Sequence, residues 1–304
     1  MAFDIDGSVV LITGGNAGIG KATAIELARR GAQVTITSRD PERGKLALDE
    51  IRQASGSDGI ERVGLDLASL ASVRRCAEEF LEHSARLDVL INNAGINLIK
   101  GVRQLTHDGF EMHFGVNHLG HFLLTDLLLD RLKASAPARI VNLASHGYML
   151  APEGLDFDDL QMERAYNAFT CYGHSKLANI QFTLELAKRL EGTGVTANAV
   201  HPGYVKTELG RRRPEDKQRF APEPETSGAK KASSGPDLSK LPPPVSADEG
   251  AETSIYLAAD PACEGVTGEY FADSQRCELS PVGADADAAA RLWAESESLI
   301  ASVS

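Results

Sequence analysis

The sequence predicts an α/β fold in which a doubly wound parallel sheet carries helices on both faces. Two observations lead to this prediction. Short apolar runs alternate with longer amphipathic segments along most of the chain, which is the pattern of repeated βαβ units. In addition, the apolar run at residues 9–13 enters a glycine-rich turn and then a segment with helical spacing, as a buried parallel strand followed by a helix would.

The expected elements follow one another in alternation. We assign strands to the short apolar and β-branched runs at residues 9–13, 33–37, 61–65, 88–91, 139–144, 196–200 and 268–271. We assign helices to segments with helical apolar spacing, at residues 19–30, 41–54, 69–83, 106–133, 172–190, 247–258 and 285–300. The result is a Rossmann fold of about seven strands. The sequence has no internal repeat, and because the alternation continues on both sides of a Pro-rich insert at residues 211–246, we treat residues 1–304 as a single domain.

Composition limits the classes of function. The chain carries 43 acidic and 31 basic side chains, a formal net charge of −12, which argues against a nucleic-acid partner because phosphates would be repelled. The first residues lack the regions of a signal peptide, and no run of about 18 apolar residues is present to span a membrane. The four cysteines form no C-x-x-C pair, so we expect free thiols and a cytoplasmic location.

Glycines at positions 14, 18 and 20 define the turn after the first expected strand. Glycine lets the backbone approach a ligand closely. The N-terminus of the following helix offers free N–H groups and the positive end of a dipole to a phosphate. The spacing is Gly-x-x-x-Gly-x-Gly rather than the commoner Gly-x-Gly-x-x-Gly. At this place in an α/β pattern, the turn predicts dinucleotide binding.

The residues after the second expected strand bear on which dinucleotide binds. Arg39 and Asp40 lie about twenty residues beyond the glycine turn, where such a fold meets the adenosine ribose. A guanidinium suits the 2′-phosphate of NADP, and Asp40 precedes Pro41 as an expected helix cap. We therefore expect NADP; the alternative is NAD, with Arg39 a solvated surface charge. Asp66 either meets the adenine or caps the helix that begins near Ser69.

Polar residues in the middle of the chain extend the expected site. Asn92-Asn93-Ala94-Gly95 follows the fourth strand, and its amides can tie neighbouring strands together. Asn117 lies in an otherwise apolar helical stretch and needs a partner or a function. His118 and His121 have a spacing that suits a metal, but no carboxylate or cysteine joins them at ligand spacing. We therefore expect packing or hydrogen bonding from these histidines and no metal site.

Three residues carry the expected chemistry. Tyr172 and Lys176 are four positions apart on one expected helix and share a face. An ammonium beside a phenol favours the phenolate and lowers the tyrosine pKa, which makes the side chain usable as a general acid or base. Ser145 follows the fifth strand, at the sheet edge where ligands of open parallel sheets bind, and its hydroxyl can hold a substrate oxygen.

These motifs, in this order, resemble the short-chain dehydrogenase/reductase family. The matching residues are Thr13-Gly14-x-x-x-Gly18-Ile19-Gly20, Asn92-Asn93-Ala94-Gly95, Asn117, Ser145, Tyr172-x-x-x-Lys176 and Pro202-Gly203. Longer strings resemble the retinol-dehydrogenase-like branch, namely residues 116–122, 172–179 and 201–203. The interval between Ser145 and Tyr172 is wider than in most of the family, although this branch also has a long loop there.

The resemblance implies a catalytic set of Asn117, Ser145, Tyr172 and Lys176. Tyr172 would be the general acid/base, Ser145 would hold the substrate oxygen, and Lys176 would bind the nicotinamide ribose. Asn117 would support a proton-relay water. Tyr172 and Lys176 would also contact the cofactor, together with Gly14, Asn16, Gly18, Ile19, Gly20, Arg39, Asp66, Leu67, Asn93, Ala94, Gly95, Pro202, Gly203, Val205 and Thr207.

The composition changes at residues 211–246, which hold seven of the thirteen prolines among Gly, Ser and Lys. We expect a mobile loop or lid inserted after the strand at residues 196–200, a feature that the resemblance does not include. The expected partner is a small-molecule alcohol or carbonyl substrate. The oligomeric state stays open, with a homo-oligomer among the outcomes.

The expected function is NADP(H)-dependent interconversion of a hydroxyl and a carbonyl on a small or lipophilic molecule. Two other classes compete with it. Residues 173–177 begin like the Gly-x-Ser-x-Gly elbow of hydrolases, but Leu177 replaces the last glycine and no strand precedes the motif. The second alternative is a non-catalytic NADP-binding regulator on the same fold, since a fold alone does not prove a function.

Overall fold

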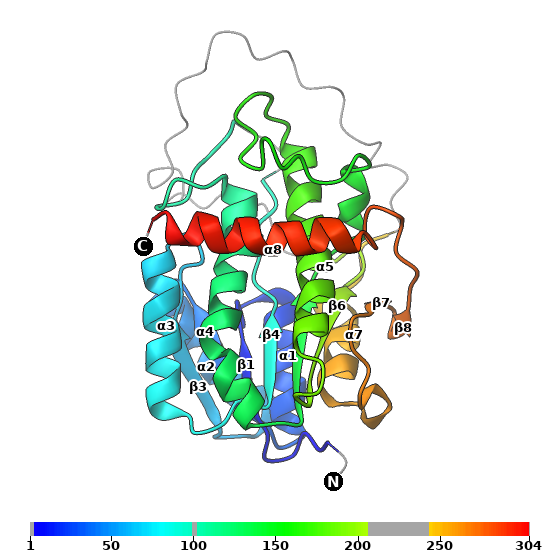
Figure 1. Cartoon of the computed structure of the whole chain (residues 1–304). Helices are drawn as coiled ribbons and strands as arrows, with labels where there is room; N and C mark the ends of the chain where they lie inside the picture. The colour runs from blue at the N-terminus through cyan, green and yellow to red at the C-terminus, as the bar shows by residue number, and fades with distance from the viewer. Residues whose placement is uncertain (1–2, 99–101, 206–242, 304) are drawn as a thin grey trace.

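A computed structural model describes residues 3–98, 102–205 and 243–303. In this part of the chain one sheet has the strand order β3-β2-β1-β4-β5-β6-β7-β8 (Figure 1). The strands are β1 (Val9–Ile12), β2 (Gln33–Ser38), β3 (Ile60–Gly64), β4 (Val89–Asn92), β5 (Ala138–Leu143), β6 (Val195–His201), β7 (Tyr270–Ala272) and β8 (Gln275–Arg276). All neighbours pair in parallel except β7 and β8. The predicted doubly wound parallel sheet is confirmed, with an eighth, two-residue strand added.

Helices cover both faces of the sheet (Figure 1). Helices α1 (Gly18–Arg29), α2 (Pro41–Ser55) and α7 (Ala247–Ala259) pack together on one face. On the other face lie α3 (Leu70–His83), α4 (Gly120–Ala134) and α5 (Ala168–Arg189), with α8 (Ala286–Ala301) across them. Shorter segments are the π-helical η1 (Phe114–Leu119) and the 3₁₀ turns η2 (His146–Leu150) and η4 (Pro261–Cys263).

The two faces of the sheet carry separate hydrophobic cores. Along β1, Leu11 packs on the α3/α4/α5 side, whereas Val10 and Ile12 pack on the α1/α2/α7 side. All three side chains are fully buried. Because successive strand residues point to opposite faces, a strand covered on both sides reads as a continuous apolar run. This is why β1 was recognisable in the sequence.

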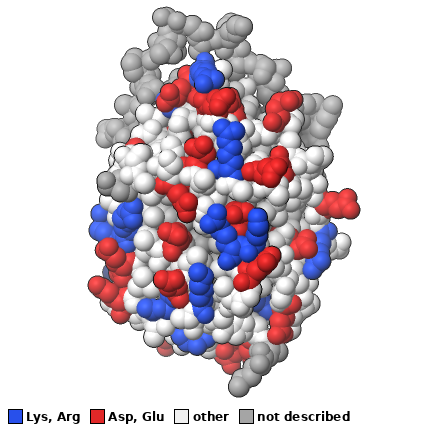
Figure 2. All heavy atoms as spheres, viewed as in Figure 1, with Lys and Arg blue, Asp and Glu red and all other residues white. Residues whose placement is uncertain are grey.

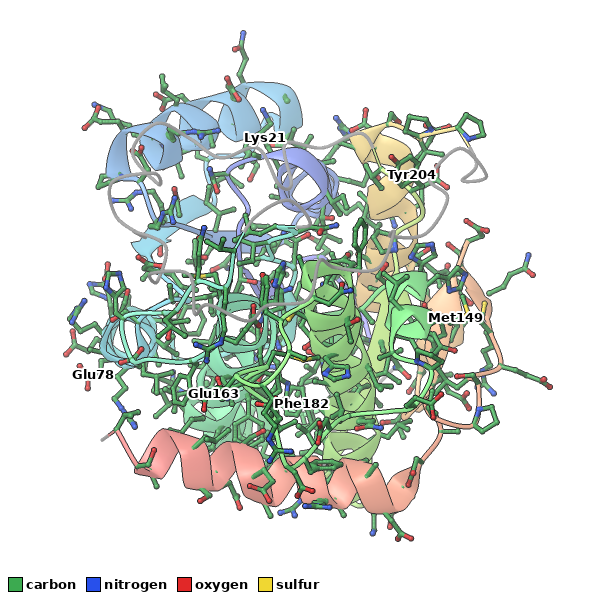
Figure 3. All side chains as sticks on the ribbon, turned by 90° about the horizontal axis from the view of Figure 1, so that it is seen from above. Lys21, Glu78, Met149, Glu163, Phe182 and Tyr204 are labelled. Carbon is green, nitrogen blue, oxygen red and sulfur yellow. The ribbon has the colours of Figure 1, made fainter. Side chains whose placement is uncertain are left out.

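Helix α8 covers α4 and α5 through an aromatic cluster. The Trp293 ring lies with its centroid 4.8 Å from that of Phe122 on α4 and 5.8 Å from that of Phe182 on α5. The guanidinium of Arg189 lies over the Trp293 ring, 4.2 Å from its centroid. Figure 3 shows Phe182 on the inner side of α8, between that helix and the rest of the molecule. The C-terminal helix is therefore attached by ring packing to the helix that carries Tyr172.

The predicted helix at residues 106–133 starts too early. In the structure, Leu105 and Glu111 form an antiparallel bridge, and the turn between them includes Gly109 at φ 87°. Thr106 N donates to Phe110 O over 2.8 Å. Glycine takes this left-handed conformation without the strain that a side chain would add. The helix begins only beyond Glu111, first as η1 and then as α4.

Two other expectations differ from the structure or fall outside it. The helix expected from Tyr172 starts four residues earlier, at Ala168, because Asn167 accepts hydrogen bonds from Phe169 N and Thr170 N as its cap. Of the expected insert at residues 211–246, residues 211–242 lie outside the described residues. Its last residues are described: Val245 forms a parallel bridge with Val205. None of the described helices is long and apolar enough to cross a membrane.

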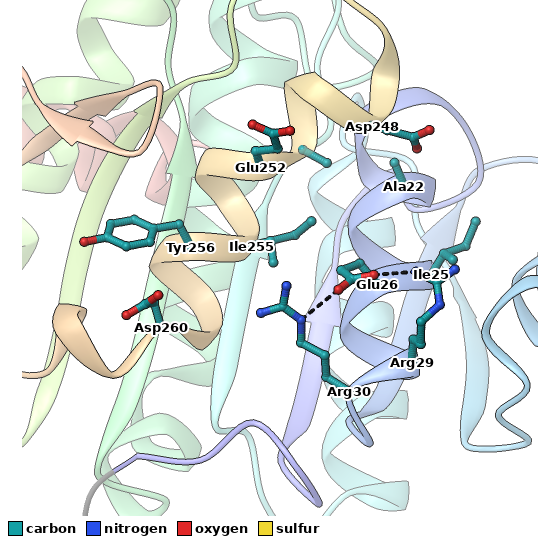
Figure 4. Close-up of a pocket in the computed structure, with 11 residues that line it drawn as sticks. Ala22, Ile25, Glu26, Arg29, Arg30, Asp248, Glu252, Ile255, Tyr256 and Asp260 are labelled. Atoms are coloured by element: carbon teal, nitrogen blue, oxygen red, sulfur yellow. Dashed lines mark hydrogen bonds and ion pairs between the residues drawn. The ribbon is translucent and has the colours of Figure 1, made fainter.

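The surface offers two features away from the sheet edge. On the face shown in Figure 2, acidic and basic side chains of the described residues are interspersed. A groove of about 480 Å³ runs between α1 and α7 (Figure 4). Its wall includes Glu26, which accepts hydrogen bonds from Arg29 and Arg30. The groove shares no lining residue with the predicted site, and we assign it no function.

We expect Trp293→Ala to lower the free energy of unfolding by about 3 kcal/mol, because the substitution removes a large buried ring and leaves a cavity. Trp293→Phe should lower the free energy of unfolding by roughly half as much, because the smaller ring still fills part of the space. Denaturant unfolding measures both changes. The control is Leu46→Ala on α2, where the side chain is 63% exposed and truncation should have almost no effect. Equal stability of Trp293→Ala and Leu46→Ala would contradict this account of α8.

Candidate active site

The predicted site residues converge at one edge of the sheet. Thr13, Asn93, Ser145 and Pro202 follow the carboxyl ends of β1, β4, β5 and β6, which are neighbours in the sheet. The strand order reverses between β1 and β4, the position at which open α/β sheets leave a crevice for a ligand. The topology therefore brings together residues that are far apart in the sequence.

The glycine turn leaves no room for side chains. A Cβ atom on Gly20 would lie 2.4 Å from Asn93 Nδ2 and 2.6 Å from Gly14 O. Gly14 itself has φ 67°, and a Cβ there would lie 3.0 Å from the Cβ of Ala94. Gly18, the first residue of α1, also has a positive φ. The turn is packed directly against the residues that follow β4.

The N-terminus of α1 has no side-chain cap, unlike those of five other long helices; α4 also has none, but it continues directly from η1. Side chains of Asp40, Ser69, Asn167, Ser246 and Asp285 cap α2, α3, α5, α7 and α8. At α1 the capping position holds Ala17, which supplies no side-chain hydrogen bond, and the first turn contains no acidic residue. The first N–H groups of a helix need partners. The residues present thus fit a phosphate group at this end of α1.

Thr13 fastens the end of β1 to the end of β4. Its Oγ1 accepts hydrogen bonds from Asn93 N and Ala94 N, both over 2.9 Å. Asn93 Nδ2 in turn donates to Thr13 O over 2.8 Å. Thr13 Oγ1 also lies 2.9 Å from His121 Nε2. The expectation that asparagine amides tie neighbouring strands is confirmed for Asn93.

The residues expected near the adenosine end lie at the ends of β2 and β3. Arg39 directly follows β2 and is partly exposed. The expected cap is confirmed, since Asp40 Oδ1 accepts from Glu42 N and Arg43 N. Asp66 does not cap α3, contrary to one of its two expected roles. It accepts from Ala68 N, and Leu67 beside it packs against Gly120 at the start of α4.

Asn117 lies in the middle of the π-helical segment η1, where the helical register widens. Its Oδ1 accepts from Ile96 N over 2.8 Å, and its Nδ2 donates to Ile96 O and to Ser175 Oγ. A Cβ atom on Gly95 would lie 3.2 Å from Asn117 Oδ1 and 3.7 Å from Lys176 Nζ. Asn117 thus joins the segment after β4 to α5 beside Lys176. π-Helical turns often occur at functional sites.

Ser145, Tyr172 and Lys176 meet at the end of β5. The Tyr172 ring and the Ser145 side chain lie together at Gly147, where an added Cβ atom would lie 2.8 Å from Tyr172 Cε1 and 3.2 Å from Ser145 Oγ. Ser145 Oγ accepts from Gly147 N over 3.0 Å, and Lys176 Nζ donates to Leu143 O over 3.1 Å. The ammonium lies 5.9 Å from the centroid of the Tyr172 ring. The structure therefore assembles the three residues as the sequence predicted.

The predicted pKa shift of Tyr172 has the wrong direction. Burial raises the pKa of Tyr172, and the hydrogen bond with Ser145 opposes this rise only in part. Burial also lowers the pKa of Lys176 to about 8. Both shifts have the same cause, because removing a charged form from water costs free energy. In the protein alone, the tyrosine is therefore held in its protonated form.

Three other residues that the sequence singled out, His118, His121 and Ser175, have hydrogen-bond partners in the structure. His118 Nε2 lies 2.8 Å from Ser296 Oγ, and His121 Nδ1 lies 3.0 Å from Asn117 O, so hydrogen bonding of both histidines is confirmed. Ser175 lies inside α5 and donates to Tyr172 O, unlike a nucleophile at a strand-to-helix turn.

Val205 and Ile19, two of the predicted cofactor contacts, both lie beside Gly250 on α7. A Cβ atom on Gly250 would lie 2.6 Å from a Val205 methyl and 3.3 Å from Ile19 Cγ1. Gly203, with φ 83°, and Pro202 connect β6 to this point, and Asn16 belongs to the turn that precedes α1. Thr207 lies outside the described residues.

Sequence reasoning missed a buried pair behind Tyr172. His113 Nδ1 lies 2.9 Å from Glu111 Oε1, and both side chains are fully buried. His113 Nε2 accepts from Leu98 N over 2.9 Å, and the imidazole packs edge-on against the Tyr172 ring. The pair fixes the segment after Gly95. A Glu and a His two positions apart near a turn gave no signal in the sequence.

A second missed group lies beside Ser145. The rings of His146 and His201 stack with centroids 4.0 Å apart, and Tyr270 Oη lies 2.9 Å from His146 Nδ1. The sequence places His146 after Ser145 and His201 before Pro202. Their pairing depends on the adjacency of β5 and β6, and Tyr270 reaches them from β7.

Comparison with known proteins supplies the class. The short chain dehydrogenase family model matches residues 8–155 and 160–218. Retinol dehydrogenase 14 from Homo sapiens is 48% identical over 307 residues, covering 97% of this chain and 86% of that protein. An uncharacterized protein from Mycobacterium Paratuberculosis has a solved structure with a TM-score of 0.74 and 35% identity, over 98% of this chain and 95% of that one.

A further solved structure is the Pseudomonas aeruginosa RhlG/NADP active-site complex, with a TM-score of 0.64 and 28% identity over 89% of this chain and 96% of that one. The fold, the assembled Ser145, Tyr172 and Lys176 and these matches define an oxidoreductase that acts on CH–OH groups. The chain belongs to the short-chain dehydrogenase family and is a retinol-dehydrogenase-like member of it.

We expect Gly20→Ala to weaken binding of a nicotinamide dinucleotide by about tenfold to a hundredfold. The added Cβ would collide with Asn93 Nδ2 and Gly14 O, and overpacking of this kind costs about 1–3 kcal/mol. Titration of protein fluorescence with NADPH and with NADH measures the affinity. Gly64→Ala in β3 is the matched control, because its Cβ would meet nothing within 4 Å. Unchanged affinity in Gly20→Ala would refute the placement of the dinucleotide on this turn.

Proposed function

We propose that this chain is an NADP(H)-dependent oxidoreductase that interconverts a hydroxyl and a carbonyl on a small lipophilic molecule, with Tyr172 as the general acid/base. The observation that carries the proposal is the placement of Tyr172 beside Ser145, with Lys176 next to them at the carboxyl edge of the sheet. Relatives 43–48% identical to the chain bear the names retinol dehydrogenase 11 to 14.

The preference for NADP rests on Arg39 and on the related structures. Arg39 follows β2, the position from which a side chain reaches the 2′ position of the adenosine ribose in this fold. A guanidinium offers forked, charge-assisted hydrogen bonds to a phosphate there. Two structural neighbours, RhlG and a short chain dehydrogenase from Burkholderia cenocepacia J2315, were solved with NADP.

The chain's own residues handle the substrate oxygen and its proton. When bound, the nicotinamide supplies or accepts the hydride. In the reductive direction, Tyr172 Oη gives its proton to the carbonyl oxygen, and the Ser145 hydroxyl holds that oxygen in place. The raised pKa of Tyr172 keeps this proton available at neutral pH. Lys176, fixed by Leu143 O, would bind the ribose hydroxyls and place positive charge near the phenolate that forms.

The proposed lipophilic substrate rests on apolar side chains around this edge. Met149 and Tyr204 are 56% and 46% exposed, and they follow Ser145 and Gly203 on the two loops that flank the site. Figure 3 shows both on the same side of the molecule. Large apolar side chains exposed beside a site favour contact with an apolar ligand.

We expect Tyr172→Phe to lower kcat by at least about a hundredfold while leaving NADPH affinity within about twofold, because only the transferable proton is removed. The measurement is nicotinamide absorbance with a panel of lipophilic alcohols and aldehydes, beside a binding titration. Full turnover by Tyr172→Phe would refute the acid/base role. NADP binding with no turnover of any panel member by the wild-type chain would instead favour a regulator on the same fold.

We expect Arg39→Asp to lower the preference for NADP over NAD by about tenfold or more. The substitution removes a charge-assisted hydrogen bond and adds repulsion between a carboxylate and the 2′-phosphate. The ratio of kcat/KM for the two cofactors measures the preference. Arg43→Asp on α2 is the control for an added negative charge nearby. An unchanged ratio in Arg39→Asp would show that this side chain does not contact the phosphate.

A further inference from the structure

The peptide that follows Ser145 has a partner from a distant part of the chain. The N–H of His146, which belongs to the peptide bond after Ser145, donates to His201 Nδ1 over 3.3 Å. Ser145 Oγ is held from the other side by Gly147 N. The orientation of the serine toward Tyr172 is thus fixed by two backbone N–H groups. One of these contacts lies within the serine loop, and the other depends on an imidazole at the end of β6.

The hydrogen bond assigns the proton on the His201 ring. A backbone N–H only donates, so His201 Nδ1 must present a lone pair, and the neutral ring carries its proton on Nε2. Burial, with the nearby His146 and Lys176, lowers the pKa of His201 to about 4. The imidazole is therefore neutral near neutral pH, and Nδ1 can accept the hydrogen bond from His146 N there.

Packing from β7 holds the pair of imidazoles in place. His146 lies between His201, with which it stacks, and Tyr270, whose Oη contacts His146 Nδ1. Tyr270 is fully buried and packs edge-on against Tyr148, also in the serine loop. Ser280 N donates to the Tyr148 hydroxyl over 3.0 Å. The loop that carries the serine is thus attached to β6, to β7 and to the segment after β8.

We propose that His201 is a positioning residue for the reaction, which acts by holding the Ser145–His146 peptide so that the serine hydroxyl stays directed at Tyr172 and the substrate oxygen. The proposal rests on the function proposed above for Ser145 and Tyr172. His201 need not touch the substrate for this role. Misplacing a hydrogen-bonding group by about 1 Å costs as much as a hundredfold in rate, so loss of this contact should appear in kcat.

The test compares two substitutions of His201, one without and one with a hydrogen-bond acceptor, and adds a variant of Tyr270. His201→Leu removes the acceptor and should lower kcat by about tenfold or more, with the KM for cofactor within about twofold. His201→Asn places an amide oxygen where Nδ1 was, so kcat should recover to within about threefold of wild type. Tyr270→Phe keeps the ring but loses the contact with His146 Nδ1, and kcat should fall by about two- to fivefold.

Two measurements separate positioning from loss of structure. Thermal unfolding of each variant shows whether it is folded, and His83→Leu at the exposed end of α3 controls for the loss of a histidine. In histidine-labelled protein, long-range ¹⁵N–¹H spectra should show His201 with an unprotonated Nδ1 and a protonated Nε2. A proton on Nδ1, wild-type kcat in His201→Leu, or equal losses in folded His201→Leu and His201→Asn would each overturn the proposal.

Failure of the positioning role of His201 can be distinguished from failure of the proposed function. If Tyr172→Phe stays active, the acid/base assignment falls, whatever the His201 variants do. If Tyr172→Phe is inactive and His201→Leu is fully active, only the positioning role falls. The state of the His201 ring is measured without any substrate, so it tests the hydrogen bond even before a substrate is identified.

Discussion

The hydroxyl of Thr13 is the contact on which the arrangement of the site depends. At the ends of the parallel strands β1 and β4, the peptide N–H groups of Asn93 and Ala94 both donate to Thr13 Oγ1. With two N–H groups donating to this oxygen, its own proton has a well-placed acceptor in His121 Nε2. His121 donates from Nδ1 to the carbonyl of Asn117, so one chain of hydrogen bonds links the glycine turn to the π-helical segment.

The features that the sequence predicted well are those set by neighbours along the chain. Buried strands, the Asp40 cap and the shared face of Tyr172 and Lys176 follow from periodicity and short spacing. The helix start near residue 106 was wrong because a turn built on Gly109 interrupts an otherwise helical pattern. The pKa of Tyr172 was wrong because burial, which no spacing reveals, outweighs the attraction of a nearby ammonium.

The uncapped start of α1 has a physical meaning that emerges only by comparison with the other helices. In five helices a side chain caps the first N–H groups, whereas α1 begins at a glycine after Ala17 and has no such cap. A capping carboxylate there would place negative charge where we expect a dinucleotide phosphate to bind. The first N–H groups of α1 therefore have no side-chain acceptor, and we expect a phosphate of the ligand to accept their hydrogen bonds.

Three imidazoles near the site share one use that differs from acid/base chemistry. His113, His121 and His201 each direct a ring nitrogen at a donor, respectively the Leu98 N–H, the Thr13 hydroxyl and the His146 N–H. A protonated ring has no lone pair for such a donor, so the contacts of His121 and His201 need neutral rings. Burial lowers the pKa of His121 and of His201 to about 4, which keeps them so. The ring nitrogens that fix the backbone around the tyrosine are already hydrogen-bonded, so they do not compete for the proton that we propose Tyr172 transfers.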